Sequence, residues 1–227
     1  MYNESMVKAI VCAVSAEAER QQEELNMKSK KFGTRQMVTT AMLCAILLIM
    51  SFTPLGYLNI GPLAISFNMI PVAIGAIALG PVGGMILGGM FGITSFLQCI
   101  GIGGTSAMGV ILFEINPFLA FVQRFVPRLL AGLLAGLVFK GVKKISNPTV
   151  ACFATGFSAA LLNTVLFMTA LVLLFGNTEY VQGLIGGRNV IVFICAFVGI
   201  NAVVEMIAAS MIVGVVGKVL SKFLIRR

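Results

Sequence analysis

Residues 51–84 read SFTPLGYLNIGPLAISFNMIPVAIGAIALGPVGG and interrupt an otherwise apolar chain at two points. The first interruption, residues 53–62, contains two prolines and two glycines, and the second is the short sequence LGPVGG at residues 79–84. Proline and glycine disfavour helix, whereas the segments beside them are apolar and free of charge. The stretch therefore predicts helices that cross a bilayer, separated first by an external loop and then by a tight turn.

The composition of the whole chain is that of an integral membrane protein. Of its 227 residues, 59% are hydrophobic and 11% are charged, and the mean hydropathy is +1.02. The chain contains no His and no Asp, so it lacks most of the usual groups for acid–base catalysis and metal binding. Its five scattered cysteines do not have the paired spacing of a zinc or redox motif. We therefore expect neither an enzyme nor a metal site.

Six apolar segments are long enough to cross the hydrocarbon core as helices, which requires about 20 residues each. They predict an all-α membrane domain over residues 34–227, preceded by a tail over residues 1–33 that we expect to be an interfacial helix. The six predicted spans are approximately 36–53, 63–80, 82–99, 117–139, 149–175 and 189–217.

The distribution of basic residues predicts the orientation of these spans. Thirteen of the 16 Lys and Arg residues lie in the N-terminal tail, between the fourth and fifth spans, or at the C-terminus. Basic residues near span ends stay preferentially in the cytoplasm. Because an even number of spans returns the chain to its starting side, we expect both termini to be cytoplasmic.

Two connections that are then external contain the polar residues of a candidate pocket. Residues 53–62 include Tyr57 and Asn59, and the glycine-rich connection at residues 99–116 includes Glu114 and Asn116. Loops this rich in helix-breaking and polar residues favour a binding role over a simple turn, although most loops only connect.

Further candidates are polar residues inside the predicted spans, where each is costly and marks a functional hypothesis. Arg124 and Arg128 lie four residues apart, as do Asn201 and Glu205, so each pair shares a helix face. The remaining candidates are Asn68, Thr94, Gln98 and Asn163. In one interpretation Arg128 and Glu205 neutralise each other and hold two helices in register. In the other, an arginine binds a substrate carboxylate while the amides bind hydroxyl and amide groups.

Ala41 and Ala45 in the first span have the four-residue spacing of small side chains that allow helices to approach closely. This spacing indicates either packing within the protein or a docking face for another protein.

The chain from about residue 34 to its end resembles the substrate-binding (S) components of energy-coupling-factor (ECF) vitamin transporters, in particular the pantothenate-type branch. The resemblance rests on residues 51–84, on FEINPFLAFVQRFVPRLLAGLLAGLVFKG, LLNTVLFM and GINAVVEMIAA, and on Ala41 and Ala45 at the position of the family's first-helix alanine motif. It implies a bacterial plasma-membrane protein that binds a water-soluble vitamin from outside with high affinity.

The resemblance also implies the partners and the site. The partners are a transmembrane coupling subunit, which Ala41 and Ala45 would contact, and two ABC-type ATPase subunits. Pantothenate would place its carboxylate on Arg124 or Arg128 and its amide and hydroxyls on Asn68, Asn163 and Asn201. The chain has no phosphate-binding loop of the form G-x-x-x-x-G-K-[ST], so we expect it to bind no cofactor and to rely on ATP hydrolysis by its partners. No nucleic-acid partner is expected.

Three alternatives remain open at this point. The first is a stand-alone secondary transporter coupled to an ion gradient through Glu205. The second is an S component for another vitamin such as riboflavin, although the absence of Trp disfavours a flat-ring ligand. The third is a membrane scaffold whose buried charges only hold its helices together.

Overall fold

The computed structural model describes residues 33–53, 56–60, 63–103, 106–186 and 190–225. The predicted interfacial helix of the N-terminal tail lies outside these residues. The chain divides into two units, Met1–Thr39 and Thr40–Arg227. The second unit contains the interior of the bundle.

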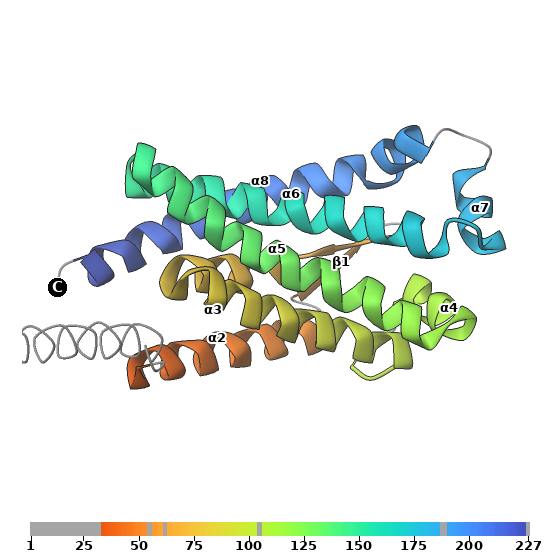
Figure 1. The fold of residues 1–227 in the computed structure, drawn as a ribbon, viewed down its shortest axis with the longest axis horizontal. Helices are drawn as coiled ribbons and strands as arrows, with labels where there is room; N and C mark the ends of the chain where they lie inside the picture. The colour runs from red at the N-terminus through yellow and green to blue at the C-terminus, as the bar shows by residue number, and fades with distance from the viewer. Residues whose placement is uncertain (1–32, 54–55, 61–62, 104–105, 187–189, 226–227) are drawn as a thin grey trace, which may run out of the picture. The chain divides into compact units, whose positions relative to one another are not determined.

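Helices make up almost all of this unit, so the predicted all-helical class is confirmed apart from one small hairpin (Figure 1). In chain order the elements are α2 (Thr34–Phe52), β1 (Tyr57–Ile60), β2 (Leu63–Ser66), α3 (Met69–Leu97), the 3-10 helix η2 (Gln98–Ile100), α4 (Ala107–Ile115), α5 (Pro117–Ile145), α6 (Pro148–Phe175), α7 (Glu179–Ile185) and α8 (Val190–Ile225).

Five of the described helices are long and apolar enough to cross a membrane. They are Thr34–Phe52, Met69–Ile100, Pro117–Ile145, Pro148–Phe175 and Ala202–Leu220. The predicted spans at 36–53, 117–139, 149–175 and 189–217 correspond to α2, α5, α6 and α8 respectively, although α5 ends six residues and α8 eight residues later than predicted.

The predicted spans on either side of residue 81 both fall within α3, which turns sharply in the middle. Gly80 has φ 79° and ψ −168°, a conformation that only glycine adopts readily, and Pro81 follows it. A Cβ atom built on Gly84 would lie 2.9 Å from the Cβ of Ala76, so the two arms of α3 lie side by side. The tight turn predicted at residues 79–84 is therefore confirmed.

The predicted start of the second span at residue 63 is wrong. Residues 63–66 form β2, which pairs antiparallel with β1 from Tyr57↔Ser66 to Ile60↔Leu63, and the helix begins only at Met69. A short apolar run does not distinguish a strand from a helix, and Gly61 and Pro62, which separate the strands in sequence, are typical turn residues. The segment predicted as a loop thus contains the first strand of a β-hairpin, and the second strand lies in residues predicted as helix.

Glycines bring α3 and α5 into very close contact. A Cβ atom on Gly84 would collide with the carbonyl oxygen of Gly132, and one on Gly132 would collide with that of Gly84. A Cβ atom on Gly88 would meet the carbonyl of Arg128 in the same way. These small residues form a packing seam between the two helices, and the seam fixes the position of Arg128 on α5 beside α3.

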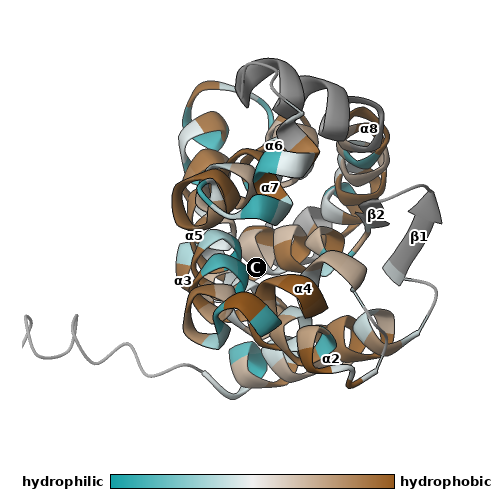
Figure 2. Cartoon of the chain, turned by 90° about the vertical axis from the view of Figure 1, so that its right-hand side faces the viewer, coloured by the Kyte–Doolittle hydropathy of each residue, from teal (hydrophilic) through white to brown (hydrophobic). Residues whose placement is uncertain are grey.

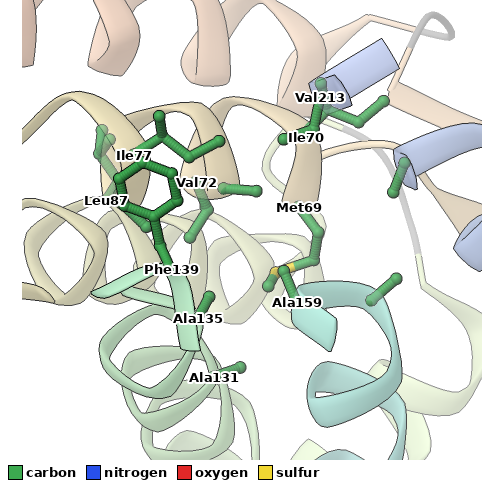
Figure 3. Close-up of a cluster of buried hydrophobic side chains, with 14 of the residues drawn as sticks. Met69, Ile70, Val72, Ile77, Leu87, Ala131, Ala135, Phe139, Ala159 and Val213 are labelled. Atoms are coloured by element: carbon green, nitrogen blue, oxygen red, sulfur yellow. The ribbon is translucent and has the colours of Figure 1, made fainter. Parts of the chain in front are cut away.

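The helices of this unit are arranged with α5 between α3 and α6, while α8 packs mainly on α6 (Figure 1). An apolar cluster fills the interior towards the Gly80 turn (Figure 3). It includes Met69, Val72, Ile77 and Leu87 of α3, Ala131, Ala135 and Phe139 of α5, Ala159 of α6 and Val213 of α8. Large apolar side chains such as Leu137, Val165 and Ile207 are also exposed on the outer surface, as expected where lipid replaces water. Hydrophobic residues make up most of the helices in Figure 2.

Candidate ligand-binding site

Buried polar side chains lie between two apolar clusters of the bundle. On α5, Ala120 belongs to one cluster and Ala131 to the other, and Arg124 and Arg128 lie between them. Asn163 occupies the corresponding position on α6, between Ala160 and Met168, and Glu205 precedes Ala209 of the first cluster on α8. These four polar side chains are at most 8% exposed. We call them, together with Asn68 and Gln123, the polar band.

The Arg124 guanidinium is bonded to neutral groups. Its Nη1 donates to the Ser95 hydroxyl at 3.3 Å, and its Nη2 donates to the Ser106 hydroxyl at 3.2 Å. The guanidinium also lies 5.3 Å from the centre of the Phe167 ring. Within the described residues, its Nε finds no hydrogen-bond partner. Because hydroxyls carry no charge, these bonds leave the buried cation suited to bind an anion.

Arg128 lies one turn further along α5, immediately after Pro127. Its Nη1 donates to the backbone carbonyl of Arg124 at 2.8 Å, and its guanidinium lies 4.6 Å from the Phe91 ring centre. Proline has no N–H and therefore weakens the helix's own hydrogen bonding at this point. The carbonyl that loses its helical donor is that of Gln123, four residues before Pro127, and the Arg128 side chain bonds the next carbonyl, that of Arg124.

Glu205 connects α8 to two other elements. Its carboxylate lies near the backbone N–H of Ser66 in β2, and Arg128 of α5 attracts it electrostatically. The β-hairpin, α5 and α8 are thus linked through one buried acid. The second carboxylate oxygen, Oε1, has no hydrogen-bond partner among the described residues.

Three carboxamide side chains of the polar band have atoms without hydrogen-bond partners in the described part of the chain. Both polar atoms of Asn68, which precedes α3, and both of Gln123 on α5 are without one, as is Oδ1 of Asn163. Asn68 and Gln123 are 0% exposed. Because buried polar atoms in proteins are nearly always hydrogen-bonded, this group fits a site whose ligand supplies the partners.

Gln123 was not among the site residues predicted from the sequence. It directly precedes Arg124 in the sequence FVQRFVP, inside a predicted span. The rule that selected Asn163, a polar side chain at membrane depth, would have selected it as well.

Two predicted site residues, Thr94 on α3 and Gln98 at the start of η2, contact α2 instead of the arginines. The Thr94 hydroxyl lies 3.2 Å from the Ser51 hydroxyl, and Gln98 Nε2 donates to the Ser51 carbonyl at 2.7 Å. These hydrogen bonds join the end of α2 to α3. Their predicted role in substrate binding remains a prediction, and the structure gives them a packing role.

The structure also places Glu114 and Asn116 apart from the arginines. Glu114 is exposed on α4. Asn116 caps α5, because its side-chain oxygen accepts hydrogen bonds from the backbone N–H groups of Phe118 and Leu119, both at 3.1 Å. The side chains of Tyr57, Asn59 and Asn201 lie outside the described part of the structure.

Ala41 and Ala45 are exposed on the same side of α2. Leu43 and Leu47, on the opposite side, are buried in the first apolar cluster. Among the described residues, nothing covers the two alanines, and their face of α2 is available to lipid or to another protein.

Separating the charges of Arg128 and Glu205 is expected to destabilise the protein. Arg128→Met alone leaves a buried carboxylate without its cation, and the melting temperature should fall by about 6 to 12 °C. The double variant Arg128→Met/Glu205→Gln should recover more than half of this loss, because no isolated charge remains. Thermal unfolding of the ligand-free protein in detergent measures both.

Lys140→Met, which removes an exposed cation from the same helix, is the matched control and should change the melting temperature little. If the effects of the two substitutions simply add in the double variant, the two charges do not stabilise each other.

The fold and the polar band together define a multi-pass membrane protein whose interior is suited to binding a small polar solute. Residues 35–217 match the family model described as "ECF transporter, substrate-specific component", and the chain belongs to this family. The family assignment made from the sequence is confirmed, and the chain is a transporter subunit that binds the substrate.

Two relatives extend over most of the chain. It is 31% identical to the "Pantothenate transporter PanT" of Leuconostoc mesenteroides over 200 residues, which cover 82% of this chain and 92% of the relative. It is 27% identical to the "Pantothenic acid transporter PanT" of Lactococcus lactis over 178 residues, which cover 70% of this chain and 86% of that protein.

Proposed function

We propose that this chain captures pantothenate outside a bacterial cell with high affinity, as the substrate-binding subunit of an ATP-driven ECF importer. The names of the two relatives support the choice of vitamin. The observation that carries the proposal is the polar band, in which a buried guanidinium is bonded to hydroxyls and several carboxamide atoms have no partner in the described residues.

The polar groups of pantothenate match this band. The vitamin has one carboxylate, one secondary amide and two hydroxyls. Arg124 binds the carboxylate, because its own bonds go to uncharged Ser95 and Ser106 whereas Arg128 is electrostatically linked to Glu205. Asn68, Asn163 and Asn201 hydrogen-bond to the amide and the hydroxyls. A guanidinium suits a carboxylate because it can donate two parallel hydrogen bonds.

The chain crosses the membrane six times when both arms of α3 are counted, with both termini in the cytoplasm. The position of basic side chains supports this orientation. Lys140 Cε lies 3.7 Å from where a Cβ of Gly80 would be, so the basic end of α5 adjoins the turn of α3. Lys143 and Lys144 follow in the last turn of α5. This end faces the cytoplasm, and the ends that bear α4 and α7 face outward.

The energy for transport comes from partner subunits. The chain associates with a transmembrane coupling subunit, through the face of α2 that contains Ala41 and Ala45, and with two ABC-type ATPases. Family membership supports this assembly in general. The chain itself only binds and presents the vitamin.

Calorimetric titration of the detergent-purified chain alone with water-soluble vitamins tests this function. Pantothenate should bind one to one with a sub-micromolar Kd, without ATP and without an ion gradient, and riboflavin should not bind. Thermal shift gives a second readout, since ligand at about 100 times Kd stabilises the folded state by about 2.7 kcal/mol. Tight binding of a different vitamin would refute the choice of substrate, and binding of none would refute the capture role.

A further inference from the structure

We infer that Gln123 determines specificity by hydrogen-bonding the secondary amide of the ligand, next to the carboxylate held by Arg124. This inference rests on the proposed function. It assigns a role to a side chain that the sequence analysis passed over.

Gln123 is buried, and its carboxamide lacks hydrogen-bond partners among the described residues. The residue is 0% exposed, and neither Oε1 nor Nε2 has a hydrogen-bond partner in the part of the chain that the structure describes. Burying a carboxamide without partners is costly, so a glutamine here needs a reason other than packing. A ligand that brings a donor and an acceptor provides that reason.

The position of Gln123 on α5 also supports this role. Gln123 immediately precedes Arg124, so the two side chains point about 100° apart around the helix. Pro127, one turn on and on the same face as Gln123, lines a groove with Leu166 and Ala170 of α6. Gln123 therefore lies on the side of α5 that packs on α6, where Phe167 of α6 also contacts the Arg124 guanidinium. We place the amide of a ligand whose carboxylate is on Arg124 at this junction.

The carboxamide of Gln123 and the secondary amide of the ligand are chemically complementary. A glutamine carboxamide offers one acceptor and an NH₂ donor, and a secondary amide offers one donor and one acceptor, so the two can form a reciprocal pair of hydrogen bonds. This pair leaves the hydroxyls and the second lone pair of the amide oxygen to the asparagines. In pantothenate only two methylene groups separate the amide from the carboxylate. The amide is thus the polar group nearest to the one that Arg124 binds. A hydroxyl at this place would engage the carboxamide less completely.

Gln123→Met tests the inference, because methionine keeps the length of the side chain and removes its polar atoms. Calorimetry would compare pantothenate with an analogue in which a CH₂ group replaces the amide N–H. The wild-type chain should bind pantothenate about 10-fold or more tightly than this analogue. Q123M should bind pantothenate about 10-fold more weakly than the wild type and should barely distinguish the two ligands.

A structural role for Gln123 would give a different result. If the carboxamide has no partner in the ligand-free protein, Q123M should melt at the same temperature as the wild type or higher. Gln182→Met, at an exposed position on α7, is the matched control and should change neither the affinity nor the discrimination.

The outcomes separate this inference from the proposed function. If the wild-type chain does not bind pantothenate, both are wrong. If the wild type binds and Q123M binds equally well, or still discriminates against the CH₂ analogue, only the role of Gln123 is wrong. A lower melting temperature of ligand-free Q123M with unchanged discrimination would make Gln123 a packing residue and would also overturn the inference.

Discussion

Replacing Arg124 with Gln is expected to lower the affinity for pantothenate at least about 100-fold, because a carboxylate that loses its buried cation forfeits several kcal/mol. The Ser95 and Ser106 hydroxyls that Arg124 bonds are uncharged and do not neutralise its positive charge, so the guanidinium can pair with the carboxylate of the ligand. Arg124→Lys keeps the charge but not the planar pair of donors, so its affinity for pantothenate should lie between those of the wild type and Arg124→Gln. Calorimetric titration of the three proteins measures the differences.

An analogue of pantothenate in which an alcohol replaces the carboxylate identifies the group that Arg124 binds. The wild-type chain should bind this alcohol about 100-fold more weakly than the vitamin, and the Arg124→Gln variant should bind the two about equally. The ligand-free variant should melt within about 3 °C of the wild type, since removing a buried cation offsets the loss of its two hydrogen bonds. If Arg124→Gln still binds pantothenate more tightly than the alcohol, Arg124 does not bind the carboxylate and Arg128 is the residue that does.

Much of the fold was predictable because lipid imposes simple rules on sequence. Long apolar runs gave four of the spans, and Gly80 with Pro81 marked the turn of α3, since a positive φ there favours glycine. The β-hairpin was missed because residues 57–66 are too short for periodicity to separate a strand from a helix. The short helices α4, within the connection predicted at residues 99–116, and α7 were missed as well. Hydroxyl caps mark their starts, because Ser106 accepts from Gly109 N–H and Thr178 accepts from Val181 N–H.

The candidate site was predictable in its residue types but not in its geometry. Arg124, Asn163 and Glu205 could be selected because polar residues are rare at membrane depth. Thr94 and Ser95 are neighbours on α3, yet Thr94 contacts Ser51 of α2 while Ser95 accepts a hydrogen bond from Arg124. Consecutive residues point about 100° apart on a helix, so their roles depend on which helix packs on each side. A single sequence does not contain that information.

Replacing both Ala41 and Ala45 with Trp is expected to stop transport without affecting capture of the ligand. Both residues are exposed on α2 and point away from the buried Leu43 and Leu47, so bulky side chains there should leave the interior unchanged. They would keep a partner helix from the close approach that small side chains permit. A loss of about 1.4 kcal/mol in the free energy of docking weakens the association with the coupling subunit about tenfold. Where association limits assembly, the fraction of assembled transporter falls by the same factor, so uptake should fall by about 10-fold or more.

Uptake of labelled pantothenate by cells that produce the complete transporter, measured beside calorimetry of the purified subunit, tests this separation of roles. Ile46→Trp is the matched control, because Ile46 is also exposed on α2 but lies about 100° around the helix from Ala45. It should retain both binding and most of the uptake, since its side chain points away from the alanine face. If it stops uptake as completely as the double variant, the effect is not specific to the alanines. If the double variant loses binding while it remains folded, the face of α2 has a role in the site itself, and the coupling subunit must dock elsewhere.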